Sequence, residues 1–149
     1  MLSLSFTESD ILSRQKDCLQ YLRDHRVSIS ISSGDRKRIL AILEHGAPSK
    51  NIPPRPVIDP ALNQPAAKQA ISNALNQAVE SACNGDMSGT VSGLEAAGAA
   101  GVAAIQAYID AGVPPPNAPS TASRKGFNKP LVDTGELYRS FTYEIRRKG

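Results

Sequence analysis

The side chains that could do acid–base or metal chemistry are few in this chain of 149 residues. His25 and His45 are its only histidines. A protein metal site needs three or four ligands close together, usually from His, Cys, Asp and Glu. Neither histidine has another such residue at three- or four-residue spacing. The sequence therefore predicts ordinary surface or loop histidines and no metal site.

The two cysteines, Cys18 and Cys83, lie far apart and in no metal-ligand spacing. A thiol nucleophile needs a positioned base beside it. The sequence offers neither a nucleophile elbow of the G-x-S-x-G type nor flanking residues that would lower a thiol pKa. We expect two reduced, buried thiols that pack on two different helices.

Glycines and carboxylates also have non-catalytic explanations. Gly93, Gly98 and Gly101 follow no predicted strand and have no adjacent Lys, so they fit neither a P-loop nor a dinucleotide fingerprint. We expect them to be small packing residues. Asp133 and Glu136 have the three-residue spacing of a capping box, in which both carboxylates would face helix N–H groups. The sequence therefore predicts no enzyme and no cofactor.

Basic side chains form three short clusters, and the net charge is +3. The clusters are Arg36-Lys37-Arg38, Arg124-Lys125 and Arg146-Arg147-Lys148. They could be solvated charge, partners for acidic surfaces of neighbouring subunits, or contacts to DNA phosphates. Aromatic content is only 5 % and Trp is absent, so base-stacking platforms are scarce. Composition leaves the three interpretations open.

The length suits one domain, which we expect to span residues 1–149. No run approaches the roughly 20 apolar residues of a membrane span. The segment 1–6 lacks the basic and apolar regions of a signal peptide. Its alternation of Leu2, Leu4 and Phe6 indicates a short strand or a tail that docks onto a neighbour.

Periodicity predicts the elements that must position these residues. We expect a helix over 8–24 with Thr7 or Ser9 as its N-cap. The alternation over 27–31 predicts a strand, and the apolar run 39–43 favours a second strand, forming an antiparallel hairpin. A helix over 35–44 is the alternative, because its residues are good helix formers.

The second half of the chain reads as two helices and two loops. Five prolines make 46–60 an irregular, stiff loop. Apolar residues at three- and four-residue spacing predict helices over 65–83 and 88–111. A Pro-rich loop covers 113–128, followed by a helical turn and a strand over 141–145 that we expect to pair with the hairpin. This order favours an α+β fold, an antiparallel sheet packed by two or three helices.

Two ordered segments carry a family resemblance. The first is Glu44-His45-Gly46 followed by Ile52-Pro53-Pro54-Arg55-Pro56. The second is Arg124-Lys125-Gly126, then Lys129-Pro130-Leu131-Val132-Asp133-Thr134-Gly135-Glu136-Leu137, with Ser140 and Tyr143 beyond. Both resemble segments of the tailed-bacteriophage morphogenesis proteins, the neck or tail-completion proteins of the head–tail joint. The resemblance covers roughly residues 27–146.

The resemblance implies a structural virion protein, assembled in the host cytoplasm, that works as a ring, typically sixfold. Its partners would be further copies of itself, other neck, connector and tail-tube proteins, and packaged DNA by non-specific contact, with no membrane involved. The residues expected to be structurally decisive or to lie at interfaces are Arg55, Pro56, Arg124, Lys125, Lys129, Pro130, Asp133, Thr134 and Gly135. A tail terminator ring and, in another class, a small DNA-binding accessory protein are the alternatives.

Overall fold

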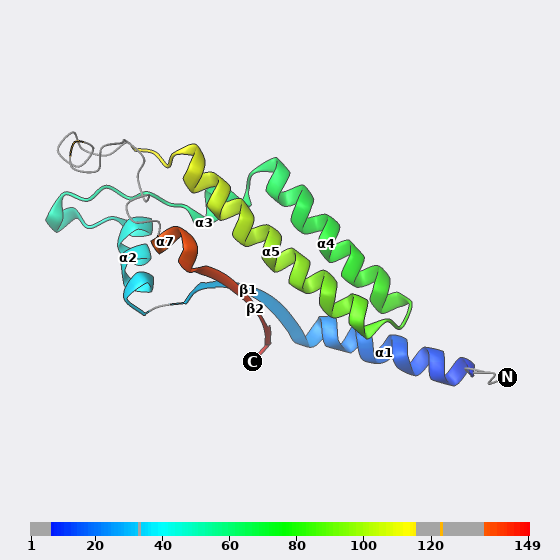
Figure 1. The fold of residues 1–149 in the computed structure, drawn as a ribbon. Coiled ribbons are helices and arrows are strands. Elements are labelled where there is room, and N and C mark those ends of the chain that lie inside the picture. Colours follow the sequence, from blue (N-terminus) through cyan, green and yellow to red (C-terminus); the bar gives the residue numbers. More distant parts are fainter. Residues whose placement is uncertain (1–6, 33, 116–122, 124–135) are drawn as a thin grey trace.

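The computed structural model describes residues 7–32, 34–115, 123 and 136–149. In chain order its elements are α1 (Glu8–Asp24), β1 (His25–Ile31), α2 (Gly34–His45), the 3-10 turn η1 (Pro48–Lys50), α3 (Ile58–Leu62), α4 (Pro65–Cys83), α5 (Met87–Ala111), α7 (Glu136–Ser140) and β2 (Phe141–Arg147). They form an α+β fold in which a two-stranded antiparallel sheet packs against helices (Figure 1). The predicted fold class is confirmed.

The sheet joins the beginning of the described chain to its end. β1 and β2 pair in antiparallel register, with Ile29 opposite Tyr143 and Ile31 opposite Phe141. Alternate residues of both strands therefore share one face, and this face packs on α5. Gly98 and Gly101 allow the close approach, because a Cβ there would lie 2.4 Å from Tyr143 and 2.5 Å from Ile29. The prediction that these glycines are packing residues is confirmed.

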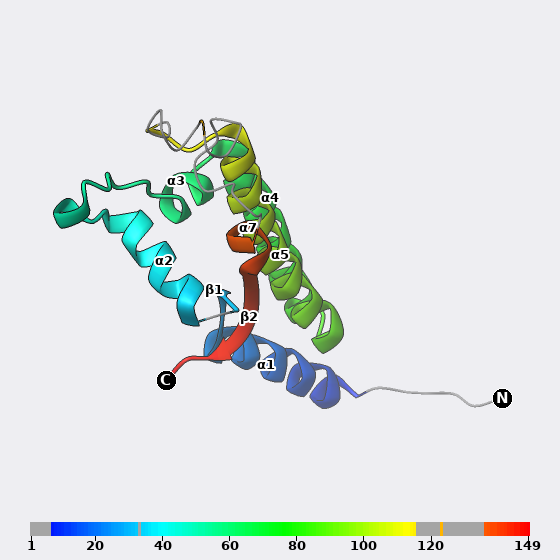
Figure 2. The same ribbon diagram turned by 60° about the vertical axis from the view of Figure 1, so that its left-hand side comes forward.

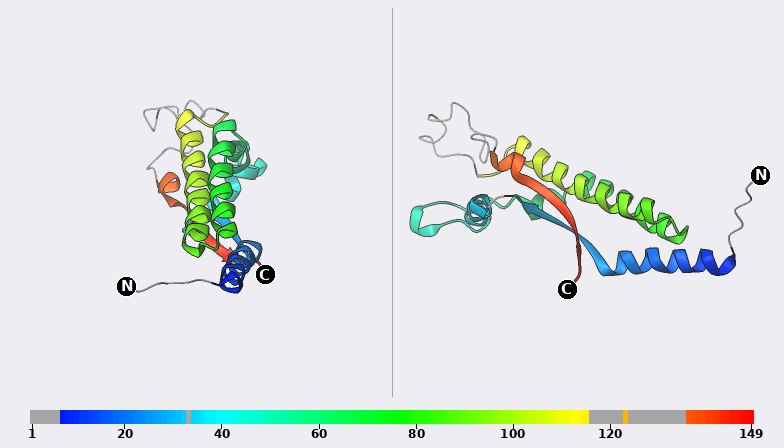
Figure 3. Two further views of the ribbon diagram at one scale, coloured as in Figure 1. Left: turned by 90° about the vertical axis from the view of Figure 1, so that its right-hand side faces the viewer. Right: turned by 60° about the horizontal axis from the view of Figure 1, so that its bottom comes forward.

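α4 and α5 form an antiparallel helical hairpin, seen along its length in Figure 3. Its two helices begin and end within one residue of their predicted bounds. Small side chains bring the axes together, since Gly93 of α5 lies against the backbone of Ala78 on α4. Asp86 caps α5 by accepting a hydrogen bond from the Gly89 N–H at 3.0 Å.

α1 has the predicted bounds and a capping box. The Thr7 hydroxyl accepts from the Asp10 N–H at 3.2 Å, and the Asp10 carboxylate accepts from the Thr7 N–H at 3.1 Å. These bonds to Thr7 lower the pKa of Asp10. Cys18 is buried as predicted, but Cys83 is exposed. The prediction of a buried Cys83 is wrong, because only the alanine stripe of α4 turns toward α5.

The predicted strand over 39–43 is also wrong, since these residues belong to helix α2. The apolar run 39–43 has no period-two alternation to fix a strand register, and its Arg, Lys, Leu, Ala and Glu residues are strong helix formers. β1 consequently pairs with β2 alone. α1 and α2 leave the sheet at opposite ends of β1 (Figure 2). The irregular loop predicted over 46–60 is interrupted by η1 and by the start of α3.

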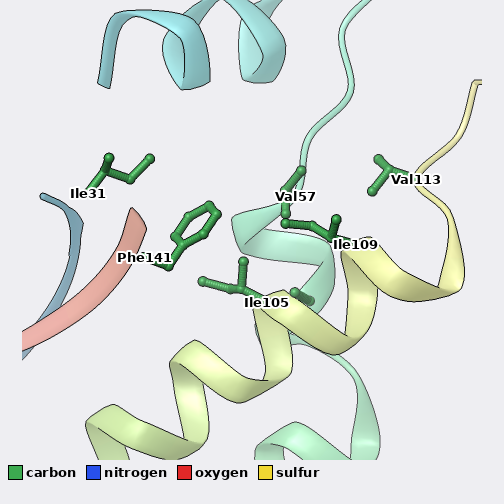
Figure 4. Packing of buried hydrophobic residues seen from close by; sticks show 7 residues of the cluster. Ile31, Val57, Ile105, Ile109, Val113 and Phe141 are labelled. Carbon is green, nitrogen blue, oxygen red and sulfur yellow. The ribbon is translucent and has the colours of Figure 1, made fainter. Parts of the chain in front are cut away.

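The main core lies where α3, α5 and the sheet meet (Figure 4). Its buried residues are Ile31, Val57, Ala61, Ile105, Ile109, Val113 and Phe141. None of the helices in the described part of the chain combines the length and the apolar character that a bilayer span requires. The predicted N-terminal strand or docking tail, most of the 113–128 loop and Asp133 of the predicted capping box lie outside the residues described.

Candidate functional site

The first segment with a family resemblance folds back on itself after α2. Gly46 has φ +74°, which turns the chain sharply. Ala47 and Ile52 then form an isolated bridge, with their N–H groups donating to each other's carbonyls at 2.9 and 3.1 Å. The Arg55 N–H donates to the Leu43 carbonyl at 2.6 Å. The segment 46–56 is therefore a closed loop, which we call the 46–56 loop. Its two ends are joined by the Ala47–Ile52 bridge and by the bond from Arg55 to Leu43 of α2.

Glu44 connects the 46–56 loop to the core through hydrogen bonds. Its Oε1 accepts hydrogen bonds from the backbone N–H groups of Val57 at 2.8 Å and Ile58 at 3.1 Å. These are donors at the start of α3 that have no partner within their own helix, so the carboxylate caps that helix from a distant element. Val57 itself is fully buried. A single side chain thus connects α2, the loop and the core.

Arg55 and Pro56 are the two predicted site residues that the structure describes. The Arg55 Nε–H donates to the carbonyl of Pro115 at 3.0 Å. The guanidinium therefore connects the 46–56 loop to the segment that follows α5. Pro56 is exposed. The other predicted site residues (Arg124, Lys125, Lys129, Pro130, Asp133, Thr134 and Gly135) lie outside the described residues.

Replacing Gly46 by Ala should destabilise the protein by about 1–2 kcal/mol, because its left-handed backbone disfavours any residue with a Cβ. A Cβ there would also lie 2.9 Å from the Ile52 carbonyl oxygen. Urea unfolding followed by circular dichroism measures the loss. Gly34→Ala is the control, since a Cβ at Gly34 meets nothing within 4 Å. Equal stability of both variants would contradict the described turn.

Replacing Glu44 by Ala should cost about 1–2 kcal/mol, because two backbone donors at the start of α3 lose their acceptor. Glu44→Gln keeps an acceptor oxygen and should retain part of that stability. Hydrogen exchange at the Val57 and Ile58 amides gives a local readout that we expect to accelerate in the Ala variant. Unchanged exchange at both amides would contradict the capping role.

The described end of the second segment packs on the core directly after the first segment. Leu137 and Tyr138 of α7 pack against the cluster that contains Val57. The Tyr138 hydroxyl donates to Asp110 Oδ2 at 3.2 Å, and the Gln106 side-chain amide donates to the Tyr138 carbonyl at 3.2 Å. Partial desolvation, with the nearby Asp110 carboxylate, raises the pKa of Tyr138. The second segment therefore packs on the same core to which Glu44 of the first segment is hydrogen-bonded.

A second feature is an open apolar groove between α1, β1 and α4, which we call the α1–α4 groove. Its volume is about 500 Å³. It is lined by Leu22, His25, Arg26, Val27, Ile29, Leu62, Ile71, Leu75, Val79, Leu94, Ala97 and Gly101. Leu75 is 39 % exposed and Val79 is 48 % exposed. Sequence reasoning missed it, although Ile71, Leu75 and Val79 recur every four residues beside the buried alanine stripe.

α2 is the least embedded of the longer helices. None of its residues is buried, and Ile39 is 49 % exposed. Leu40 and Ala41 line a smaller groove of about 290 Å³ between this helix and the sheet. The C-terminal end of the helix is hydrogen-bonded through the Leu43 carbonyl and the Glu44 carboxylate, and Leu40 packs against the core.

The basic cluster of residues 146–148 is engaged within the chain. Arg146 forms an ion pair with Glu144, and its hydrogen bond lowers the pKa of that carboxyl. The Lys148 ammonium donates to the Arg23 carbonyl at 2.8 Å. The Lys148 contact joins the end of β2 to α1, whereas the Arg146–Glu144 pair lies within β2.

The geometry offers binding surfaces, and we find no catalytic constellation in the described part of the chain. Across the described ranges, no three His, Cys, Asp or Glu side chains lie close enough together to hold a metal ion. His25 stacks on Tyr21 with ring centroids 3.9 Å apart, and its Nδ1 lies 2.9 Å from the Tyr21 carbonyl oxygen. Comparison with protein-family models, curated proteins and solved structures gives no match to this chain.

Proposed function

We propose that this protein is a structural subunit of the bacteriophage neck, one copy of a ring that joins or completes the tail at the head–tail interface. The observation that carries the proposal is the ordered pair of segments at Glu44–Pro56 and Arg124–Tyr143, which resemble the neck or tail-completion proteins. Glu44 of the first segment accepts hydrogen bonds from the N–H groups of Val57 and Ile58, and Leu137 and Tyr138 of the second segment pack against the core cluster that contains Val57. A shared core is what two parts of a single structural module require.

The structure suits a protein that acts by presenting rigid surfaces to neighbouring subunits. The 46–56 loop is held in place by backbone hydrogen bonds, by the Glu44 cap and by the hydrogen bond from Arg55 to Pro115. A loop fixed in this way loses little conformational entropy when it enters an interface. Apolar surface remains open on α4 and on α2. Rigid elements with unpartnered apolar surface suit a subunit whose neighbours complete it.

In this proposal the partners are identical copies, with six as the expected number, and the adjacent connector and tail-tube proteins. The protein would be located in the virion after assembly in the host cytoplasm. Identical subunits that contact each other through two different surfaces close into a ring only when the rotation between them is right. Packaged DNA could touch the ring wall through cations alone, without sequence readout.

Particles made without this protein test the proposal. If it joins heads to tails, electron micrographs should show free filled heads and free tails of normal length. Overlong tails would instead indicate a terminator of the tail tube. Mass spectrometry of purified particles should find the protein at several copies per particle. Its absence from particles would overturn the proposal.

A further inference from the structure

The sheet has an open edge along β1. The Ser32 N–H donates to the Ser140 carbonyl at 3.0 Å, just beyond the paired strands. Residues of an antiparallel ladder alternate between those that bond the opposite strand and those that do not. Counting back from Ser32 in steps of two, the N–H and carbonyl groups of Val27 and Ile29 point away from β2. No described residue forms a hydrogen bond with these groups, so a further strand could pair with them.

The α1–α4 groove lies beside this edge. Val27 and Ile29 of β1 line it, and the exposed side chains of Leu75 and Val79 on α4 form the facing wall. β1 and α4 both pack on α5, with the groove between them. Neighbouring strands of a sheet lie about 4.8 Å apart. A third strand beside β1 would therefore lie over the groove, with alternate side chains directed toward α4.

Residues 2–6 have the pattern that such a strand needs. Leu2, Leu4 and Phe6 alternate with Ser3 and Ser5. As a strand, this segment would have one apolar face and one polar face. The apolar face would cover the groove, and the serines would face water.

The spacing of the apolar side chains matches on the two sides. Along a strand, every second residue recurs at about 6.6 Å, which is the expected separation of Leu2, Leu4 and Phe6. Ile71 lines the groove one helical turn before Leu75. Residues four apart on a helix, as in this row and on to position 79, recur at about 6 Å. The apolar side chains of the segment can therefore pack against successive side chains of α4.

Segment 2–6 cannot pair with β1 of its own chain. It joins α1 at Thr7, whereas β1 begins at His25, beyond the other end of that helix. At 1.5 Å per residue these two residues are about 27 Å apart. Five extended residues reach at most about 18 Å. Figure 1 shows the start of α1 pointing away from the sheet, so the pairing requires two copies.

The charges of the two surfaces are compatible. The ionisable side chains in the groove lining, His25 and Arg26, are both basic. Segment 2–6 has no charged side chain, and the first one that follows it is the acidic Glu8. Opposite charges at the rim of an apolar contact help to fix its register.

We propose that residues 2–6 of one copy pair with the open edge of β1 in a second copy and fill its α1–α4 groove with Leu2, Leu4 and Phe6. Addition of a strand to an exposed sheet edge is a common mode of recognition, in which backbone hydrogen bonds supply affinity and side-chain pockets supply specificity. The segment and the groove are different surfaces, so the contact is heterologous and can build a ring. This inference rests on the proposed function, since it specifies how neighbouring subunits of the ring meet.

Disulfide trapping tests the contact in the full chain. Cys83 is exposed and is replaced by Ser, while Cys18 is buried and stays. Leu4→Cys with Leu75→Cys places one thiol in the middle of the segment and the other in the middle of the groove, and should give disulfide-linked oligomers on oxidation. Gln77→Cys in place of Leu75→Cys is the control, because Gln77 is exposed on the other side of the buried alanine stripe of α4. Equal trapping by the two pairs would overturn the proposal.

Hydrogen exchange at the Val27 and Ile29 amides reports the backbone pairing. Both amides should exchange fast in the dilute monomer and more slowly as self-association, followed by sedimentation velocity, increases with concentration. Leu4→Asp should abolish this slowing and weaken self-association at least about tenfold, because a carboxylate would face the apolar groove. Ser5→Asp is the matched control, since its side chain would face water, and it should behave like the unmodified chain.

Two results of these measurements would overturn the proposal. Slow exchange at both amides in the dilute monomer would mean that the edge of β1 is already covered within one chain. A protein that stays monomeric and untrapped at every concentration would show that the segment does not dock onto a second copy.

The two proposals can fail separately. Oligomers that form without trapping between positions 4 and 75, in a protein still found in particles, would remove this contact and leave the neck function standing. Trapped oligomers of a protein absent from particles would keep the contact and remove the neck function.

Discussion

Replacing Ile105 by Ala should lower the free energy of unfolding by about 2–5 kcal/mol, the largest loss expected from any substitution considered for this protein. Ile105 is fully buried on α5, in the cluster that also contains Val57, Ile109 and Phe141. Figure 4 shows its side chain among residues contributed by the sheet, by α3 and by α5 itself. Truncation removes buried methyl groups and leaves a cavity between elements that cannot all collapse at once.

Urea unfolding monitored by circular dichroism measures this loss. Ile39→Ala is the matched control, because the same side chain is half exposed on α2 and its truncation should change stability by about 0.5 kcal/mol or less in the monomer. If Ile105→Ala were no more destabilising than Ile39→Ala, the packing at the centre of the core would be wrong.

Replacing Gly93 by Ala should be the second most damaging change, at about 2 kcal/mol net. A Cβ there would lie 2.6 Å from the backbone nitrogen and 2.7 Å from the Cα of Ala78. Backbone atoms cannot rotate away, so α4 and α5 would have to separate along their contact. Overpacking of this kind typically costs about 1–3 kcal/mol or more, and the better helix propensity of Ala returns only about 1 kcal/mol.

Gly101→Ala provides the comparison for Gly93→Ala within the same helix. The nearest atom to a Cβ at Gly101 is Ile29 Cδ1 at 2.5 Å, the far end of a flexible side chain, and the next is 3.6 Å away. Rotation of Ile29 can relieve this contact, so the loss should be smaller by at least about 1 kcal/mol. Thermal melts of both variants decide the matter. A Gly93 variant as stable as the Gly101 variant would refute the close approach of the two helices.

Sequence patterns predicted the helical hairpin and both strands because each element has local signals, either residues that start or end a helix or the alternation of a strand. Pro65 starts α4, Asn84-Gly85 ends it, and Gly112 ends α5. The strands were recognisable from their period-two alternation, which one buried face imposes. The same reasoning failed at 39–43, where an unbroken apolar run fits either a strand or a helix. There the choice depends on helix propensity and on the availability of β2 as the partner of β1.

The contacts of the candidate site were less accessible from sequence. The hydrogen bond from the start of α3 to Glu44 joins two elements separated by a loop, so no local sequence spacing predicts it. The α1–α4 groove arises because β1 and α4 both pack on α5 without covering each other. Arg55 was selected for its position between prolines, and its acceptor, the Pro115 carbonyl, is distant in sequence. Such features depend on tertiary arrangement.

The pairing of β1 with β2 has a consequence for biosynthesis. Ile31 and Phe141 face each other although 110 positions separate them. At about 5–20 residues per second, a ribosome needs roughly 5–20 s to add the residues between them. During that interval the nascent chain can form the α4–α5 hairpin from local contacts. Val27 and Ile29 have no strand partner until β2 has been synthesised. Folding is then finished by the last described strand to be synthesised, so a translation product arrested before Phe141 would expose an apolar strand edge to chaperones and proteases.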